Sequence, residues 1–154
     1  MACTDNNLLY FMGGLHSVPK IGFEDIMDTV LKNKHAFALI NTLPPTEQDC
    51  LIVNTLSAYA EESVMNQLIS SNKAHHIIVY GRNANDPSLV KKYEQLTKIG
   101  FTNVYVYLGG MFEWLLLQEI YGTDAFPTTN KCKDMYQYRP PKFLGGFGTA
   151  MIER

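Results

Sequence analysis

The sequence predicts a single α/β domain in which helices cover both faces of a mostly parallel sheet. Short apolar runs rich in β-branched and aromatic residues alternate along the chain with helical stretches of about ten to thirteen residues. Such alternation indicates strand–helix–strand crossovers, which make neighbouring strands parallel and place helices over the sheet. The length of 154 residues, of which 46% are hydrophobic, fits one domain with a proper core.

The boundaries of these elements follow from periodicity and from helix start and stop signals. Ile26 and Val30 recur at helical spacing, and Asp86 and Gly100 bracket another helix as its N-cap and terminator. A loop is forced at Pro44-Pro45. The predicted elements are a short strand or turn leading into a helix at 21–31, strands at 35–40 and 50–53, a helix at 58–70, a strand at 77–80, a helix at 87–99, a strand at 104–108 and a helix at 111–121.

Composition excludes several classes of function. The formal net charge is −2, which gives no electrostatic footprint for nucleic acid or for an anionic membrane. The longest apolar runs, at 77–80 and 115–117, are far shorter than the roughly 20 residues of a membrane span. Asp5, Asn6 and Asn7 precede the first short apolar stretch, so we expect no signal peptide there. We therefore expect an intracellular, cytoplasmic protein.

The cysteines and histidines predict neither a disulfide framework nor a metal site. There are three cysteines, Cys3, Cys50 and Cys132, and no CxxC pair. The adjacent His75 and His76 open a strand, where neighbouring side chains point to opposite faces and cannot share one ion. We expect no metal and no cofactor.

A motif in the second half of the chain indicates a family. The strand that ends at Tyr80 is followed by a loop and a helix, then by Gly100-Phe101, then by Asn103-Val104 and a second strand, and then by Gly109-Gly110 with Trp114 four residues on. This run resembles the second half of a rhodanese domain, and the resemblance extends more loosely over residues 18–122. It implies a three-layer α/β/α fold with a five-stranded, mostly parallel sheet. We expect an N-terminal segment at 1–17 and a rhodanese-like domain at 18–126. The irregular sequence beyond Pro127, with Pro140-Pro141 and Gly145-Gly146, predicts a C-terminal tail at 127–154.

The resemblance also locates the family's nucleophile, a cysteine directly after the strand that ends at Tyr80. Gly81 occupies that position here, so no persulfide can form there. The related cell-cycle phosphatases need the same cysteine and an arginine six positions later, where this chain has Pro87. We interpret the loop as a vestigial active site consisting of Gly81, Arg82, Asn83, Ala84, Asn85 and Asp86.

The residues of this loop oppose an anion. Asp86 before Pro87 forms a good N-cap, and its carboxylate would take the N–H of Ser88 or Leu89 that an anion would otherwise use. Two like charges about 4 Å apart repel by ~1 kcal/mol in water and by more at lower effective dielectric. Arg82 is the loop's single cation and offsets this in part.

Two functions follow as hypotheses. The first is a catalytically inactive rhodanese-like domain that acts as a protein-binding or regulatory module, meeting a partner or a second copy through the helix at 111–121 or through the aromatic tail, with Tyr136, Tyr138, Phe143 and Phe147. The alternative is a sulfurtransferase that uses a relocated thiol, for which Cys50 is the candidate. A buried, inert Cys50 is the interpretation that we favour.

Overall fold

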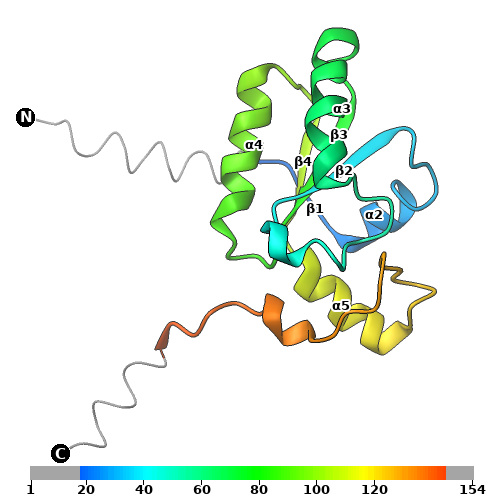
Figure 1. Ribbon diagram of the computed structural model, residues 1–154, viewed down its shortest axis with the longest axis vertical. Helices are drawn as coiled ribbons and strands as arrows, with labels where there is room; N and C mark the ends of the chain where they lie inside the picture. The colour runs from blue at the N-terminus through cyan, green and yellow to red at the C-terminus, as the bar shows by residue number, and fades with distance from the viewer. Residues whose placement is uncertain (1–17, 145–154) are drawn as a thin grey trace, which may run out of the picture.

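The structure is a computed structural model, and it describes residues 18–144 of the chain. Cys3, Phe147 and the predicted N-terminal segment 1–17 lie outside the described residues. The sheet has four strands, all parallel, in the order β1-β4-β3-β2 (Figure 1). These strands are β1 (Lys20–Ile21), β2 (Phe37–Asn41), β3 (His76–Tyr80) and β4 (Val104–Tyr107).

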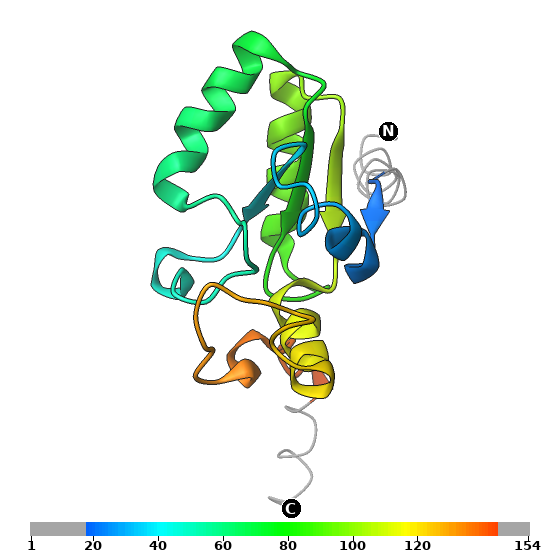
Figure 2. The same cartoon turned by 90° about the vertical axis from the view of Figure 1, so that its right-hand side faces the viewer.

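Helices lie on both sides of these strands, as the sequence predicts. Figure 2 shows α2 and α3 on opposite sides of the sheet. The helices are α2 (Phe23–Asp28), α3 (Ala58–Ser71), α4 (Pro87–Ile99) and α5 (Gly110–Tyr121), and two short 3₁₀ helices are η1 (Pro45–Glu47) and η2 (Met135–Tyr138). Within residues 18–144, no helix combines the length and apolar character that crossing a membrane requires.

Alternation along the strands divides the core into two halves. On β3, Ile77 and Val79 face α3 and α4, whereas Ile78 and Tyr80 face α2 and α5. All four side chains are buried. A strand covered on both faces needs apolar residues at every position, which explains why this segment reads as one continuous apolar run.

The predicted strand at 50–53 is wrong, and the sheet has four strands rather than five. Ile52 forms only an isolated antiparallel bridge with Thr128. The segment is instead anchored by Tyr80, whose hydroxyl accepts the N–H of Ile52 at 3.2 Å and lies 2.8 Å from Thr55 Oγ1. Burial raises the pKa of the Tyr80 phenol well above its ordinary value, so the hydroxyl keeps its proton. A side-chain anchor thus replaces the ladder that a fifth strand would make.

The segment after α5 packs on the domain. Trp114 Nε1 donates to the carbonyl of Pro127, and Tyr138 in η2 is buried. Figure 1 shows this segment running beside α5 at one end of the molecule. The apolar α5 is therefore covered in part by the chain itself. Its outer end stays open, since Ile120 is 70% exposed and Tyr121 is 66% exposed.

Candidate functional site

The loop at 81–86 connects β3 to α4 at the carboxyl end of the sheet. Parallel strands bring their carboxyl ends to one edge, so Thr42, the residue after β2, lies beside it. The backbone N–H of Thr42 donates to the carbonyl of Tyr80 at 2.9 Å. In open parallel sheets this edge is where ligands bind, which makes the loop the first candidate for a site.

The Asp86 carboxylate is the centre of the loop's hydrogen bonds. Its Oδ1 accepts the backbone N–H of Ser88 at 3.0 Å, which confirms the predicted N-cap of α4. Its Oδ2 accepts the backbone N–H of Arg82 at 3.0 Å. The Ser88 hydroxyl lies 2.6 Å from Oδ1 and 2.7 Å from Thr42 Oγ1. A negative charge of the chain itself therefore binds the N–H groups at both ends of the loop.

The same carboxylate fills the space next to Gly81. A Cβ atom on Gly81 would lie 2.5 Å from Asp86 Oδ2 and 2.8 Å from Thr42 Oγ1. Both distances are shorter than carbon and oxygen atoms tolerate without moving. Any side chain at position 81 would therefore have to displace the Asp86 carboxylate from its hydrogen bonds.

Arg82, the cation predicted to offset this charge, is engaged elsewhere. Its guanidinium binds both carboxylate oxygens of Glu47 in η1, with Nε 2.9 Å from Oε2. Such a two-point pair holds the planar guanidinium in one orientation. Arg82 therefore ties the loop to η1, and its charge is already matched by a carboxylate.

Asn83 connects the loop to the C-terminal segment. Its side chain is buried, donates to the carbonyl of Tyr138 at 2.8 Å and accepts the N–H of Asn85 at 2.9 Å. Removing a buried amide that serves two partners would leave both without a hydrogen bond. The hydrogen bond from Asn83 thus attaches the loop to η2, which lies more than fifty residues later in the chain.

Gly110 allows the start of α5 to lie close to the loop. The N–H groups of Met111 and Phe112 donate to the carbonyls of Gly81 and Arg82 at 3.0 and 2.9 Å. Gly110 has a φ of +62°, and a Cβ atom there would lie 2.5 Å from the Gly81 carbonyl oxygen. The backbones of α5 and the loop therefore approach at Gly110 more closely than any residue with a side chain permits.

A cleft of about 460 Å³ opens over this loop. Its walls come from the loop, from the residue after β2 and from the C-terminal segment. The lining includes Thr42, Pro44, Arg82, Asn83, Asn85, Asp86, Pro87, Ser88, Arg139 and Pro141.

Comparisons with known proteins agree with this architecture. Residues 44–117 match the sequence model of the family described as the rhodanese-like domain. The chain carries a rhodanese-like domain. The comparison with curated proteins gave no match.

Solved structures show the same fold as this rhodanese-like domain. The BH2092 protein from Bacillus halodurans is 16% identical, with a TM-score of 0.55 over 74% of this chain and 83% of that one. The rhodanese-like domain of the Alr3790 protein from Anabaena sp. is 21% identical, with a TM-score of 0.50 over 82% and 93% of the two chains. A thiosulfate sulfurtransferase from Pseudomonas aeruginosa is 17% identical, with a TM-score of 0.53 over 69% of this chain and 21% of that one.

The structure places Cys50 apart from the loop of the rhodanese-like domain. Cys50 is buried, its Sγ lies 3.3 Å from the carbonyl oxygen of Asn130, and it borders a separate cavity of about 120 Å³ together with Cys132. Burial, reinforced by the neighbouring Cys132, raises the pKa of the Cys50 thiol to about 11. At neutral pH the thiol is protonated, and the thiolate is the form that attacks sulfur.

Sequence reasoning found part of this site and missed the rest. It identified Gly81 and Asp86, and the structure places the Asp86 carboxylate in the space that a Cβ atom on Gly81 would occupy. It missed Glu47 and Arg139, which reach the loop and the cleft from distant parts of the chain. No sequence signal marks either residue. Among the described residues, no three His, Cys, Asp or Glu side chains gather as a metal site would need.

Proposed function

We propose that this rhodanese-like domain is a protein-binding module that does not transfer sulfur at the loop 81–86. The observation that carries the proposal is the position of the Asp86 carboxylate, 2.5 Å from where a side chain on Gly81 would begin. In the family that the sequence resembles, this is the position of the reactive cysteine. Asp86 is a fixed charge of the chain where an active member would bind a sulfur anion.

The hydrogen bonds of the loop support the same proposal. The N–H groups of Arg82 and Ser88 already donate to Asp86, and those of Met111 and Phe112 donate to loop carbonyls. Anion sites in proteins are built from such N–H groups when they are free and converge on one point. An incoming anion would have to compete with a carboxylate held at an effectively very high local concentration.

A thiosulfate:cyanide sulfurtransferase assay tests the proposal. We expect the turnover of the full chain to equal that of serum albumin, and Cys50→Ser to leave it unchanged. Turnover well above albumin that Cys50→Ser abolishes would overturn the proposal in favour of a relocated thiol. Turnover that survives Cys50→Ser would overturn it in favour of chemistry elsewhere in the chain.

The cellular setting is part of the same proposal. We place the module inside the cell, because the three cysteines contain no CxxC pair and Cys50 and Cys132 are free thiols. Localisation of the tagged full chain by fluorescence microscopy is the measurement, and secretion into the medium would contradict the assignment.

A further inference from the structure

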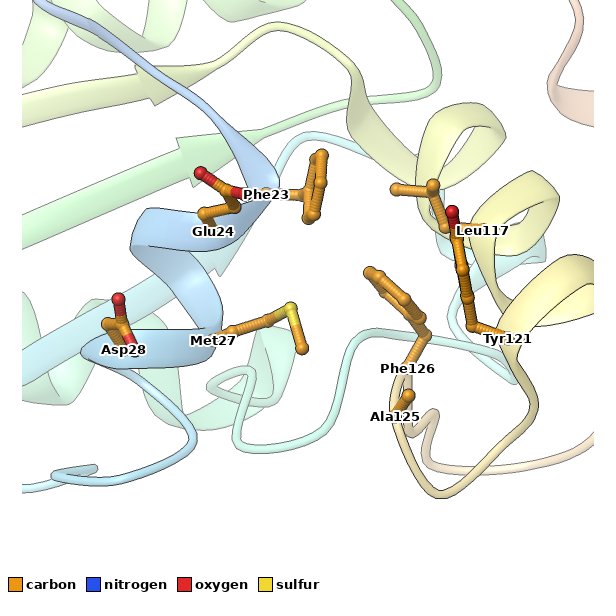
Figure 3. A pocket seen from close by; sticks show the side chains of 8 residues that line it. All are labelled: Phe23, Glu24, Met27, Asp28, Leu117, Tyr121, Ala125 and Phe126. Carbon is orange, nitrogen blue, oxygen red and sulfur yellow. The ribbon is translucent and has the colours of Figure 1, made fainter.

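A second concave surface lies between α2 and α5, away from the loop 81–86. It has a volume of about 680 Å³ and is larger than the cleft over the loop. We call it the α2–α5 groove. Figure 3 shows Phe23 and Met27 on the α2 side and Leu117, Tyr121 and Phe126 on the α5 side.

Aromatic rings form the floor of the α2–α5 groove. The Phe126 ring is buried and lies 5.7 Å from the ring of Phe23 and 6.0 Å from that of Tyr121, measured between centroids. Tyr121 and the adjacent Ile120 are mostly exposed. Rings that are fixed on one side and open on the other offer a large contact area at little entropic cost, as in the anchors of binding interfaces.

The charged residues that line the groove are both acidic. Glu24 and Asp28 line it on α2, and the helices α2 and α5 contain no lysine or arginine. Lys32 lies 2.5 Å from Asp28 Oδ1, so it neutralises one of the two carboxylates. Glu24 has no such partner among the described residues. The groove therefore has an apolar floor and an acidic border.

We propose that the α2–α5 groove binds a short segment of a partner protein in which aliphatic or aromatic anchors are flanked by lysine or arginine. This inference rests on the proposed function as a binding module and names its surface. The anchors would lie on Phe23, Phe126 and Tyr121. The cations would pair with Glu24 and, in place of Lys32, with Asp28. Charges at the rim of such a site select the partner and steer its approach more than they add affinity.

The same charges disfavour two other occupants. A second copy of this chain bound through the same surface would bring Glu24 and Asp28 near their own counterparts, because a twofold interface uses one patch twice. An anionic membrane would meet carboxylates where membrane-binding surfaces carry lysine and arginine. A basic, amphipathic segment meets neither penalty.

The test uses isotope-labelled full chain and two synthetic peptides. The first peptide has leucine and phenylalanine on one helical face and lysines at both ends, and the second has glutamate in place of every lysine. We expect the lysine peptide to shift the amide resonances of Phe23, Met27, Leu117 and Phe126. We expect the glutamate peptide to bind at least about tenfold more weakly.

Matched charge reversals complete the test. Glu24→Lys combined with Asp28→Lys is expected to weaken binding of the lysine peptide about tenfold. The control, Glu62→Lys combined with Glu94→Lys, makes the same change in net charge at exposed positions of α3 and α4 and is expected to leave binding unchanged. Equal binding of the two peptides, equal effects of the two double variants, or shifts confined to other surfaces would each overturn the inference.

Other occupants give distinct results. If resonances of residues 1–17 or 145–154 move in the Glu24→Lys/Asp28→Lys chain without peptide, the chain's own end occupies the groove and the inference is overturned. A dimer by light scattering that this variant abolishes, or binding to phosphatidylserine vesicles, would also overturn it. If the chain shows sulfurtransferase turnover and still binds the lysine peptide, the proposal that it is not a catalyst is overturned, whereas the inference about the groove is supported.

Discussion

The loop 81–86 and the α2–α5 groove differ in whether their side chains already have partners within the chain. In the loop, polar groups bind one another, with Asp86 taking N–H groups of Arg82 and Ser88 and Arg82 pairing with Glu47. In the groove, the aromatic side chain of Tyr121 remains largely exposed. The loop therefore contributes to the stability of the fold, whereas the groove leaves contact area available for another molecule.

This difference agrees with the proposal that the loop does not catalyse sulfur transfer and instead stabilises the fold. Where a nucleophile is absent, the inward-pointing N–H groups around it still need acceptors, because buried N–H groups without partners are costly. Asp86 supplies one acceptor from within the loop, and the Gly81 and Arg82 carbonyls accept from α5. We expect substitutions in the loop to lower the free energy of unfolding and substitutions in the groove to leave it almost unchanged.

Gly110→Ala is the substitution with the largest expected effect. The new methyl group would lie 2.5 Å from the Gly81 carbonyl oxygen and 2.9 Å from the Arg82 carbonyl carbon, and these backbone atoms cannot rotate away. Combining the cost of a left-handed alanine with the cost of overpacking gives a loss of about 3 kcal/mol in the free energy of unfolding. Denaturant titration of the full chain measures it.

Gly100→Ala is the control for that prediction. Gly100 also has a left-handed φ, of +117°, but its nearest contact would be the flexible side chain of Lys73 at 3.4 Å. We expect a loss of only about 1 kcal/mol. Equal losses at the two positions would show that the contact between α5 and the loop is not close.

The reactivity of the Cys50 thiol is the second test. If Cys50 transferred sulfur, the domain would be an enzyme, and the contrast between an inactive loop and a binding groove would not hold. Its pKa of about 11 lies above the ordinary value of 9.0, so at pH 7.5 its thiolate fraction is about a hundredfold below that of an ordinary cysteine. In a chain with Cys3→Ser and Cys132→Ser, we expect iodoacetamide to modify Cys50 about a hundredfold more slowly than it modifies a cysteine in a short unstructured peptide. Mass spectrometry gives both rates.

The pH dependence of the same thiol has a definite sign. Because folding raises its pKa, the protonated thiol contributes stability that is fully present below about pH 9 and is lost as the pH rises toward about 11. Cys50→Ala should remove this part of the alkaline loss of stability. Rapid alkylation of Cys50 at neutral pH would contradict the assignment of a buried, inert thiol.

Gly81→Cys has the next largest expected effect. Its Cβ atom would lie 2.5 Å from Asp86 Oδ2, and displacing that carboxylate should lower the free energy of unfolding by about 2 kcal/mol. We expect no persulfide on the new cysteine after incubation with thiosulfate, as measured by intact-mass spectrometry. A robust persulfide would show that Asp86 does not block the site.

A double variant tests whether the Asp86 carboxylate is what prevents a persulfide at position 81. Gly81→Cys combined with Asp86→Ala removes the obstructing carboxylate and frees the N–H groups of Arg82 and Ser88. We expect some persulfide to form in this chain. Gly81→Cys combined with Glu47→Ala is the control, since it removes a nearby acid that does not contact position 81 in the described structure.

Sequence reasoning succeeded where the determining signals are local. The bounds of α4 were predicted correctly because Asp86, Pro87 and Gly100 act within a few residues of the helix ends. The parallel sheet with helices on both faces followed from the alternation of strands and helices, and the family followed from the motif around Gly109-Gly110.

Sequence reasoning failed where contacts between segments that are distant in the chain determine the structure. The run at 50–53 has the composition of a strand, but its partner is Thr128 and its anchor is the Tyr80 hydroxyl. The pairing of Arg82 with Glu47 joins residues 35 positions apart. The α2–α5 groove combines Phe23 with Phe126, which are near only in the folded chain. Periodicity and spacing report on neighbours in sequence and contain no information on such contacts.

Tyr121→Ala has the smallest expected effect on stability and completes the comparison. Tyr121 is 66% exposed, and its ring lies 6.0 Å from the Phe126 ring. We expect the free energy of unfolding to fall by about 0.5 kcal/mol, little more than for Tyr59→Ala on α3, where the side chain is 98% exposed. Binding of the lysine peptide should nevertheless fall about fivefold in Tyr121→Ala and not in Tyr59→Ala. A loss of stability above about 2 kcal/mol would mean that Tyr121 closes the core, and the groove would then be part of the fold rather than a surface for a partner.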